Sequence, residues 1–223
     1  AIRKKPDSSV VKCVRLLKDD ENAEAFVSAG STGAVLTAAV LLSPRIKGVN
    51  RPALAPLFPN MKGGETLFLD CGANADCKPI NLQQFAVMGS VYMNQVKGVK
   101  QPKVALLSNG TEDAKGNALT KEAFVLLKNT PSVNFVGNME ARDILSGEYD
   151  VVVTDGFYGN IALKSMEGMV SCIFSELKTQ IYSSFKGKIG GMLLKKSFKK
   201  VKDRLDYNKK GGALLLGMKK TVV

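Results

Sequence analysis

The sequence of 223 residues predicts an α/β protein with a mostly parallel sheet, flanking helices and a basic amphipathic helical extension near its carboxyl end. Two observations predict the sheet. Short apolar runs alternate with helical patterns, and these runs are continuously apolar rather than alternating with polar residues. Continuous runs are typical of strands covered on both faces, and strand–helix alternation is typical of parallel sheets. A lysine-rich stretch with apolar residues at helical spacing predicts the extension.

The expected elements begin with a strand over 25–29 and a helix of small residues over 34–42, joined by a glycine-containing turn. Residues 44–62 hold four prolines and are expected to form an irregular connection between two subdomains. The alternation of strand and helix then continues. Strands are expected over 66–69, 104–107, 133–136 and 150–154, and helices over 81–96 and 119–128.

Composition excludes several classes of protein. The chain has no histidine, so its own residues cannot build a Ser-His-Asp triad, a Cys-His dyad or a His-ligated zinc site. Its four cysteines are scattered without a C-x-x-C pair, which is typical of reduced thiols inside a cell. No apolar run approaches the roughly 20 residues that span a bilayer. We therefore expect a cytoplasmic protein without a metal site.

The net charge of +12 indicates an anionic partner, such as nucleic acid, a membrane surface or an acidic protein. Between Lys178 and Lys210, eleven lysines and arginines stand against two aspartates, a net charge of +9. Most of the excess thus lies in one helical segment, expected over 166–210. That segment is expected to separate an α/β core over 1–165 from a return to the core over 211–223.

Apolar and basic residues share a helical spacing in this segment, beside a hinge expected at Gly187, Gly190 and Gly191. A basic amphipathic helix of this kind predicts contact with an anionic membrane surface. The alternative is a pair of dimerisation helices whose lysine face is solvated. The two functions are compatible if the base of the helical segment packs in a dimer and its tip contacts lipid. The expected contact residues are Leu194, Lys195, Lys196, Phe198, Lys199, Lys200, Val201 and Lys202.

Polar loops follow four of the expected strands, and open α/β sheets bind ligands outside the carboxyl ends of their strands. Each loop alone is also explained as an ordinary turn, but the four together predict one shared site. Lys115 suits a phosphate or an oxyanion, or is a solvated surface lysine; Asn160 suits an oxyanion donor, or caps a helix. The other candidates are Gly30, Ser31, Thr32, Gly33, Asn74, Lys78, Asn109, Gly110, Asn117 and Asp155.

Motifs at these loops resemble the acyl-ACP:phosphate acyltransferase family of bacterial phospholipid synthesis (PlsX). They include S-A-G-S-T-G-A over 28–34, D-C-G-A-N-A-D-C-K-P over 70–79, E-D-A-K-G-N over 112–117 and D-V-V-V-T-D-G-F-Y-G-N-I-A-L-K over 150–164. The match runs in the family's order from near residue 3 to about residue 217. The family's first strand with its D-x-M-G-G-D loop, and its G-H-G-x-S segment, have no counterpart, so the chain is expected to be a fragment.

The resemblance implies a Rossmann-like fold, similar to phosphotransacetylases and isopropylmalate dehydrogenases, in a homodimer without a cofactor. It implies transfer of a fatty acyl group from acyl carrier protein to inorganic phosphate, giving acyl phosphate for phosphatidic acid synthesis. It also implies peripheral membrane association and a membrane glycerol-phosphate acyltransferase as a partner. The basic segment that is expected to contact the membrane is also a candidate surface for the acidic acyl carrier protein.

In the implied chemistry, Lys115 binds phosphate or the thioester oxygen, and Asn160 donates to the tetrahedral oxyanion. Phosphate is its own nucleophile and a thiolate leaves readily, so no histidine base is needed. A covalent acyl-enzyme on Cys71 is the alternative route. One departure from the family lies at Ser31, where many relatives have asparagine.

Other functions remain open at this point. A phosphotransacetylase-like enzyme that uses acyl-CoA would have similar loops. A dehydrogenase of the isopropylmalate type is disfavoured because its Asp-rich metal cluster is not evident. A nucleic-acid-binding module would explain the charge, but aromatic residues make up only 7% and form no stacking stripe, so we expect no nucleic acid partner. A non-catalytic membrane scaffold is the remaining alternative.

Overall fold

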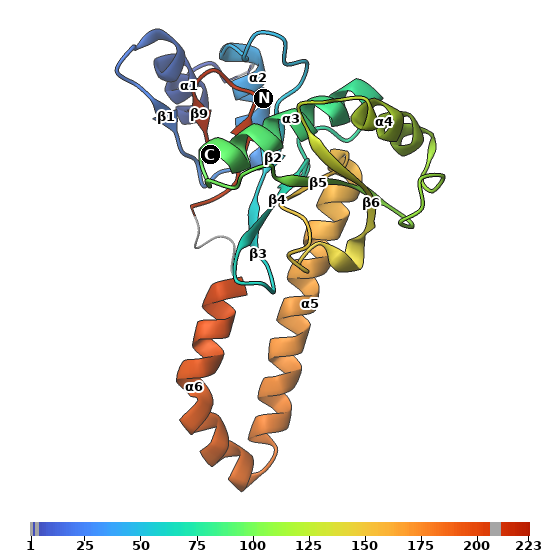
Figure 1. The fold of residues 1–223 in the computed structure, drawn as a ribbon. Coiled ribbons are helices and arrows are strands. Elements are labelled where there is room, and N and C mark those ends of the chain that lie inside the picture. Colours follow the sequence, from blue (N-terminus) through green and yellow to red (C-terminus); the bar gives the residue numbers. More distant parts are fainter. Residues whose placement is uncertain (1, 3–4, 206–210) are drawn as a thin grey trace.

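A computed structural model describes residues 2, 5–205 and 211–223. It has a central α/β part, a smaller lobe formed by both ends of the described chain, and a long helical hairpin that extends away from the sheet (Figure 1). This arrangement confirms the predicted fold class, a mostly parallel α/β sheet with flanking helices and a helical extension.

The central sheet has five strands in the order β3-β4-β7-β5-β6. Strands β4 (Glu65–Leu69), β7 (Val151–Val153), β5 (Lys103–Ser108) and β6 (Asn134–Glu140) are parallel, and β3 (Leu57–Pro59) pairs antiparallel with β4 at the edge. The four parallel strands are those expected from continuous apolar runs. Those runs predict strands because both faces of this sheet are covered.

Two clusters of apolar side chains cover the two faces of the sheet. On one face, α3 (Pro79–Gln95) and α4 (Ala118–Lys128) contribute Phe85 and Leu127 to a cluster with Leu67 and other strand residues. On the other face, the first turns of α5 (Gly156–Tyr182) contribute Leu163 to a cluster with Phe68 and Val152. The beginning of α5 is therefore fixed against the sheet, while the rest of it runs into the hairpin.

The smaller lobe joins the first residues of the chain to the last. Its apolar cluster combines Val14 and Ala38 with Leu215 and Val222. Its elements are α1 (Ser9–Asp19), β1 (Ala25–Phe26), α2 (Thr32–Leu42), β2 (Ala53–Ala55), β8 (Leu214–Leu216) and β9 (Thr221–Val222). Strand β1 pairs in parallel with β9, and β2 pairs antiparallel with β8.

Two sequence expectations were wrong in this region. The strand expected over 25–29 is only two residues long and lies in the small lobe rather than in the central sheet. The proline-rich connection is not wholly irregular, because it contains β2 and β3. Proline is tolerated there because Pro56 lies between the two strands and Pro59 ends an edge strand, where a missing N–H donor is least costly.

The hairpin consists of α5 and α6 (Phe185–Leu205), and its turn is at Ser183 and Ser184. The glycines expected to form a hinge lie inside α6 instead. A Cβ built at Gly191 would lie 2.5 Å from Cγ2 of Ile181, so glycine here allows the two helices to approach closely. The expected segment 166–210 begins in the middle of α5, and its residues 206–210 lie outside the described part of the chain.

Gly89 on α3 tests how closely this helix packs on the sheet. A Cβ there would lie 2.6 Å from Cγ1 of Val151 and 2.8 Å from Cδ1 of Leu69. We expect Gly89→Ala to lower the free energy of unfolding by about 1–3 kcal/mol, because the helix or the strands must shift. Urea denaturation measures this effect.

The matched control is Gly168→Ala on α5, where a Cβ would meet no atom within 4 Å. This variant should be more stable by about 0.5–1 kcal/mol, since alanine loses less conformational entropy in a helix. Equal effects of the two substitutions would contradict the close packing of α3.

Candidate active site

The carboxyl ends of β4, β5 and β7 lie at one edge of the sheet. Leu69 is in register with Val153, and Val153 with Leu106, so the segments that follow these strands start side by side. They are the loop after β4, the loop over 109–117 and the first turn of α5. This is the edge at which open α/β sheets bind ligands.

Asp70, directly after β4, organises the first of these loops. Its carboxylate is fully buried and accepts four hydrogen bonds. Oδ1 accepts from the N–H groups of Leu54 (2.9 Å) and Ala73 (3.0 Å), and Oδ2 from the N–H (2.7 Å) and Nδ2 (2.8 Å) of Asn74. Burial raises the pKa of Asp70, and these hydrogen bonds act in the opposite direction.

Two glycines allow α5 to begin against this loop. The N–H of Gly156 donates to the carbonyl of Asn74 at 2.8 Å, and a Cβ at Gly156 would lie 2.7 Å from that oxygen. A Cβ at Gly159 would overlap the carbonyl oxygen of Asp70. The motif G-F-Y-G thus brings the helix backbone into direct contact with the loop backbone.

A first cavity of about 640 Å³ lies between the small lobe and α5. It brings together three residues of the glycine-rich turn, Gly30, Thr32 and Gly33, with the predicted donor Asn160. Gly72, with φ of +124°, adopts a conformation that favours glycine, and a Cβ there would lie 3.6 Å from Oδ1 of Asn160. Lys164 also lines this cavity one turn beyond Asn160, and its ammonium forms an ion pair with Glu167 at 2.8 Å.

A second cavity of about 750 Å³ lies on the other side of α5, between this helix and the carboxyl end of β5. Two predicted residues, Asn109 and Asn117, line it. Asn117 is the N-cap of α4, and its Oδ1 accepts a hydrogen bond from the N–H of Thr120 at 2.9 Å. The residues predicted for one shared pocket are therefore distributed over two cavities on either side of α5.

Lys115 lies in the exposed part of the loop over 109–117. It packs beside the buried Gly110, where a Cβ would lie 2.8 Å from Cγ of Lys115 and 2.9 Å from Oε2 of Glu112. Its neighbours Asn109 and Gly116 line the second cavity. Glycine at position 110 thus lets the stem of Lys115 lie flat on the loop, near the rim of that cavity.

The remaining predicted residues have clear structural contacts. Nδ2 of Asn74 donates to Asp70 and to the carbonyl of Pro52 (2.7 Å), so both of its amide hydrogens are used within the loop. Lys78 is the exposed N-cap residue of α3 and Ser31 that of α2. Asp155, whose pKa is raised by burial, caps α5 by accepting from the N–H of Tyr158 at 2.8 Å.

Some residues of the candidate site were missed from the sequence. Asp70 follows an apolar run directly, which is visible in the sequence. The turn-forming residues after it predict an exposed loop, so its burial could not be predicted. Ser108 lines the second cavity, and its buried hydroxyl oxygen has no hydrogen-bond partner in the described part of the chain. Lys164 follows Asn160 by four residues, and in a helix this spacing places both side chains on one face, which is the signal that could have identified it.

Cys71 lines the first cavity but does not have the properties of a nucleophile. Its side chain is buried, and burial together with the neighbouring Asp70 raises the pKa of its thiol well above the usual value. Its Sγ lies 3.7 Å from the carbonyl oxygen of Phe68. Nucleophilic cysteines are thiolates in partly exposed, electropositive surroundings, so this geometry disfavours an acyl-enzyme on Cys71.

Within the described ranges, no group of three or more Cys, Asp and Glu side chains gathers as metal ligands would. The class of protein follows from the sheet and from the cavities at its carboxyl edge: the fold is that of the phosphotransacetylases. A phosphotransacetylase from Streptococcus pyogenes superposes with a TM-score of 0.56 at 23% identity, over 71% of this chain and 54% of that one. The EutD phosphotransacetylase from Staphylococcus aureus superposes with a TM-score of 0.55 at 22% identity, over 70% of this chain and 54% of that one.

The particular family is shown by sequence. Residues 1–223 match the family described as Fatty acid synthesis protein, and the chain belongs to this family. It is 50% identical to proteins named Phosphate acyltransferase from Bacillus cereus (strain G9842) and Bacillus mycoides (strain KBAB4), over its whole length and 67% of theirs. The resemblance inferred from the motifs is confirmed, and the family is one of acyltransferases. The chain spans about two thirds of these relatives and about half of the phosphotransacetylases.

Asp70→Asn tests the buried carboxylate. The variant replaces an oxygen that accepts two hydrogen bonds with an amide NH₂ that faces the same two donors. We expect a loss of about 1–3 kcal/mol in the free energy of unfolding near neutral pH. Asp76→Asn, an exposed carboxylate of the same loop, is the control and should change stability by less than about 0.5 kcal/mol.

The destabilisation by Asp70→Asn should also depend on pH. Because burial raises the pKa of Asp70 above its ordinary value of 3.8, the folded state binds more protons there than the unfolded state. The contribution of Asp70 to the free energy of unfolding of the wild type therefore falls as the pH rises from 3.8 through the raised pKa. The destabilisation by Asp70→Asn should be larger in acid than at neutral pH. Denaturation curves at several pH values measure it, and a pH-independent difference would contradict the buried state of the group.

Proposed function

We propose that the protein transfers an acyl group from acyl carrier protein to inorganic phosphate, which yields acyl phosphate for phosphatidic acid synthesis. The observation that carries this proposal is the 50% identity, over the whole chain, to proteins named Phosphate acyltransferase. The first cavity supports it, because a glycine-rich turn, an amide and a lysine line one space of a size typical for ligand sites.

The glycine-rich turn supplies the proposed phosphate site. It forms the N-terminus of α2, a helix of eleven residues that begins at Thr32 and whose first N–H groups favour an anion. Asn160 faces the same cavity from α5 and adds a hydrogen-bond donor. Lys164 adds an ammonium group that would exchange its ion pair with Glu167 for one with phosphate. Phosphate bound here would lie at the carboxyl edge of the sheet.

The proposed reaction needs few protein groups. A phosphate oxygen attacks the thioester carbonyl carbon, a C–O bond forms, and the C–S bond breaks as the carrier thiolate leaves. The tetrahedral intermediate carries a negative charge on the former carbonyl oxygen. We assign Asn160 as a donor to this oxyanion and Lys115 as the cation that binds phosphate or the thioester oxygen. Both residues follow adjacent parallel strands, β7 and β5.

A second candidate donor is acyl-CoA. The likeness of the fold to phosphotransacetylases favours it, while the names of the more similar Bacillus relatives leave the donor unstated. The lysines of α6 favour the carrier protein, because an acidic protein gains more from an extended basic surface than a small thioester does. An assay with both donors separates these candidates.

The activity test uses the whole protein with palmitoyl-acyl carrier protein or palmitoyl-CoA and labelled phosphate. Asn160→Ala should lower kcat by about 10²–10³-fold, the usual effect of removing an oxyanion donor. Lys115→Ala should weaken phosphate use and lower kcat/KM with the carrier-protein donor. Lys121→Ala, an exposed lysine of α4, is the matched control and should behave as wild type.

Three outcomes are informative. Acyl phosphate from the carrier-protein donor, lost in both site variants, supports the proposal. Acyl phosphate from palmitoyl-CoA alone would move the assignment to a phosphotransacetylase-like activity. Absence of acyl phosphate with either donor would remove the enzymatic proposal.

The hairpin supports a homodimer and a peripheral membrane contact as further parts of the proposal. Met169, Ile173 and Leu177 form an exposed apolar stripe along α5, suited to a second copy of the hairpin. Near the turn, Phe185 and Leu193 are each 78% exposed, and lysines surround them on α6. No described helix is both long and apolar enough to cross a membrane. From the exposed apolar residues and lysines of the hairpin tip, we propose a cytoplasmic protein that rests on the membrane there, near a membrane glycerol-phosphate acyltransferase.

Charge removal on α6 tests the membrane contact. A variant with Lys195, Lys196, Lys199 and Lys200 changed to glutamine should bind anionic vesicles of phosphatidylglycerol at least a hundredfold more weakly, at about 1 kcal/mol per lysine before screening. The control carries arginine at the same four positions and should bind as wild type. Flotation of vesicles measures both. Wild-type binding by the glutamine variant would instead favour a dimerisation helix with a solvated lysine face.

A further inference from the structure

The second cavity is polar at one end and mostly apolar along its length, where Arg142 and Ser165 are the polar exceptions. Ser108, Asn117 and Thr120 lie at the end formed by β5 and α4. Along α5, the lining runs from Tyr158 to Met169, about three helical turns or roughly 16 Å. The apolar lining residues are Leu107, Ile144, Ile161, Ala162, Met166 and Met169.

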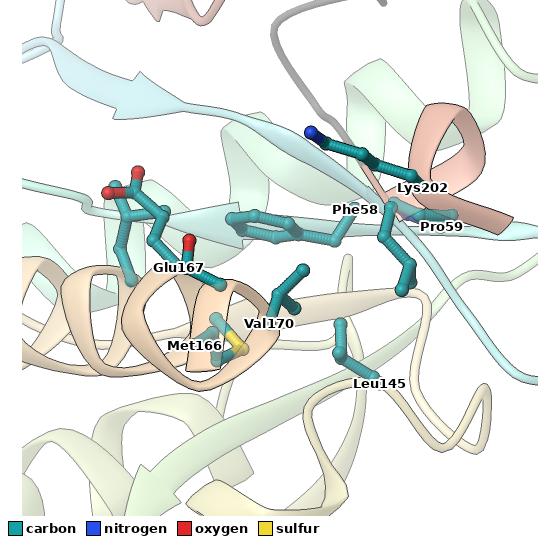
Figure 2. A pocket seen from close by; sticks show the side chains of 10 residues that line it. Phe58, Pro59, Leu145, Met166, Glu167, Val170 and Lys202 are labelled. Carbon is teal, nitrogen blue, oxygen red and sulfur yellow. The ribbon is translucent and has the colours of Figure 1, made fainter. Parts of the chain in front are cut away.

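A smaller cavity of about 340 Å³ adjoins this space, between α5, β3 and the end of α6. Figure 2 shows Phe58 of β3 and Met166 and Val170 of α5 among its lining side chains, with Lys202 contributed by α6. Met166 lines both cavities. It is half-buried and packs against the apolar cluster that contains Phe58. Met166 therefore lies where the larger and the smaller cavity adjoin, one turn before the exposed Met169.

We propose that the larger cavity binds the acyl chain of the substrate and that Met166 sets the longest chain it accepts. The inference rests on the proposed acyl transfer, and it names the place of the acyl group. The reacting end of the acyl group would lie at the polar end, beside the first turn of α5, where Tyr158 lines this cavity and Asn160 lines the first cavity with the proposed phosphate site. Ser108 has a buried hydroxyl oxygen there without a partner in the described chain, and Lys115 lies on the neighbouring loop. The methyl end would reach Met166.

An acyl chain fits the polarity and the volume of this cavity. The lining along the helix is mostly apolar, with Ser165 as its one purely polar side chain there, and most other polar groups lie at the end formed by β5 and α4. This distribution matches a fatty acyl group with a carbonyl at one end. The volume of about 750 Å³ falls within the roughly 300–1,000 Å³ of small-molecule sites. The flexible thioether of Met166 suits a variable methyl end, because methionine adapts to irregular apolar contacts.

The test measures how affinity and activity depend on chain length in the whole protein. Fatty acids from octanoic to stearic acid compete with the fluorescent cis-parinaric acid, and acyl-carrier-protein donors of the same lengths are assayed for acyl phosphate. For wild type, affinity should rise by about fourfold per methylene until the chain reaches Met166, and then stop rising.

Two variants move this limit in opposite directions. Met166→Ala joins the two cavities, so the longest chains should bind at least tenfold more tightly than they bind to wild type. Ala162→Leu fills the larger cavity, so the limit should move to shorter chains. Met61→Ala, an exposed methionine that lines neither cavity, is the matched control and should leave the profile unchanged.

A second substitution keeps the test specific. Val170 lines only the smaller cavity, so adding Val170→Phe to Met166→Ala should refill the space and abolish the gain for long chains. The melting temperature of each variant, measured in parallel, identifies any variant that fails to fold, and Met166→Leu then replaces Met166→Ala as the smaller change.

The two readouts separate this inference from the proposed function. If the variants shift the binding profile but neither they nor the wild type make acyl phosphate, the result would support the acyl-chain site and reject the proposed reaction. An active enzyme whose chain-length profile is the same in wild type, Met166→Ala and Ala162→Leu would overturn the inference.

Discussion

The buried carboxylate of Asp70 links three parts of the molecule that come from distant positions in the chain. It accepts hydrogen bonds from β2, at Leu54, and from its own loop, at Ala73 and Asn74. The carbonyl of Asn74 in turn receives the first N–H of α5. A charge placed in an apolar interior is unfavourable unless every lone pair has a donor, so this one group defines the loop, the edge of the small lobe and the start of the helix together.

Because α5 begins against this loop, it divides the carboxyl edge of the sheet into two spaces with different chemistry. On one side lie backbone N–H groups, an amide and a lysine; on the other lies a mostly apolar space with a polar end. The proposed transfer of an acyl group to phosphate would use both environments. The first turn of α5 is the place where the two environments meet.

The predictable parts of this fold are those encoded in local sequence patterns. The parallel strands and the helices between them were expected because continuous apolar runs and helical spacing are local signals. Strands β1, β2, β8 and β9 have two or three residues each, and their pairing depends on partners far away in the chain. The four site loops were identified from turn residues, yet their division between two cavities depends on the backbone contacts of Gly156 and Gly159. Likewise, Gly191 predicted a hinge but serves helix contact, because glycine has the same sequence signature in both roles.

The composition of the small lobe has a consequence for synthesis on the ribosome. Val14 and Leu17 of α1 pack with Leu215 and Val222, and Phe26 pairs with Val222, so early residues take partners that are translated only after the hairpin. Domains usually fold as their residues emerge, and pairing between such distant segments is slow. The parts of α1 and α2 that pack against β8 and β9 therefore remain uncovered until those two strands are synthesised. During that interval the nascent chain offers chaperones a binding surface that the finished protein no longer has.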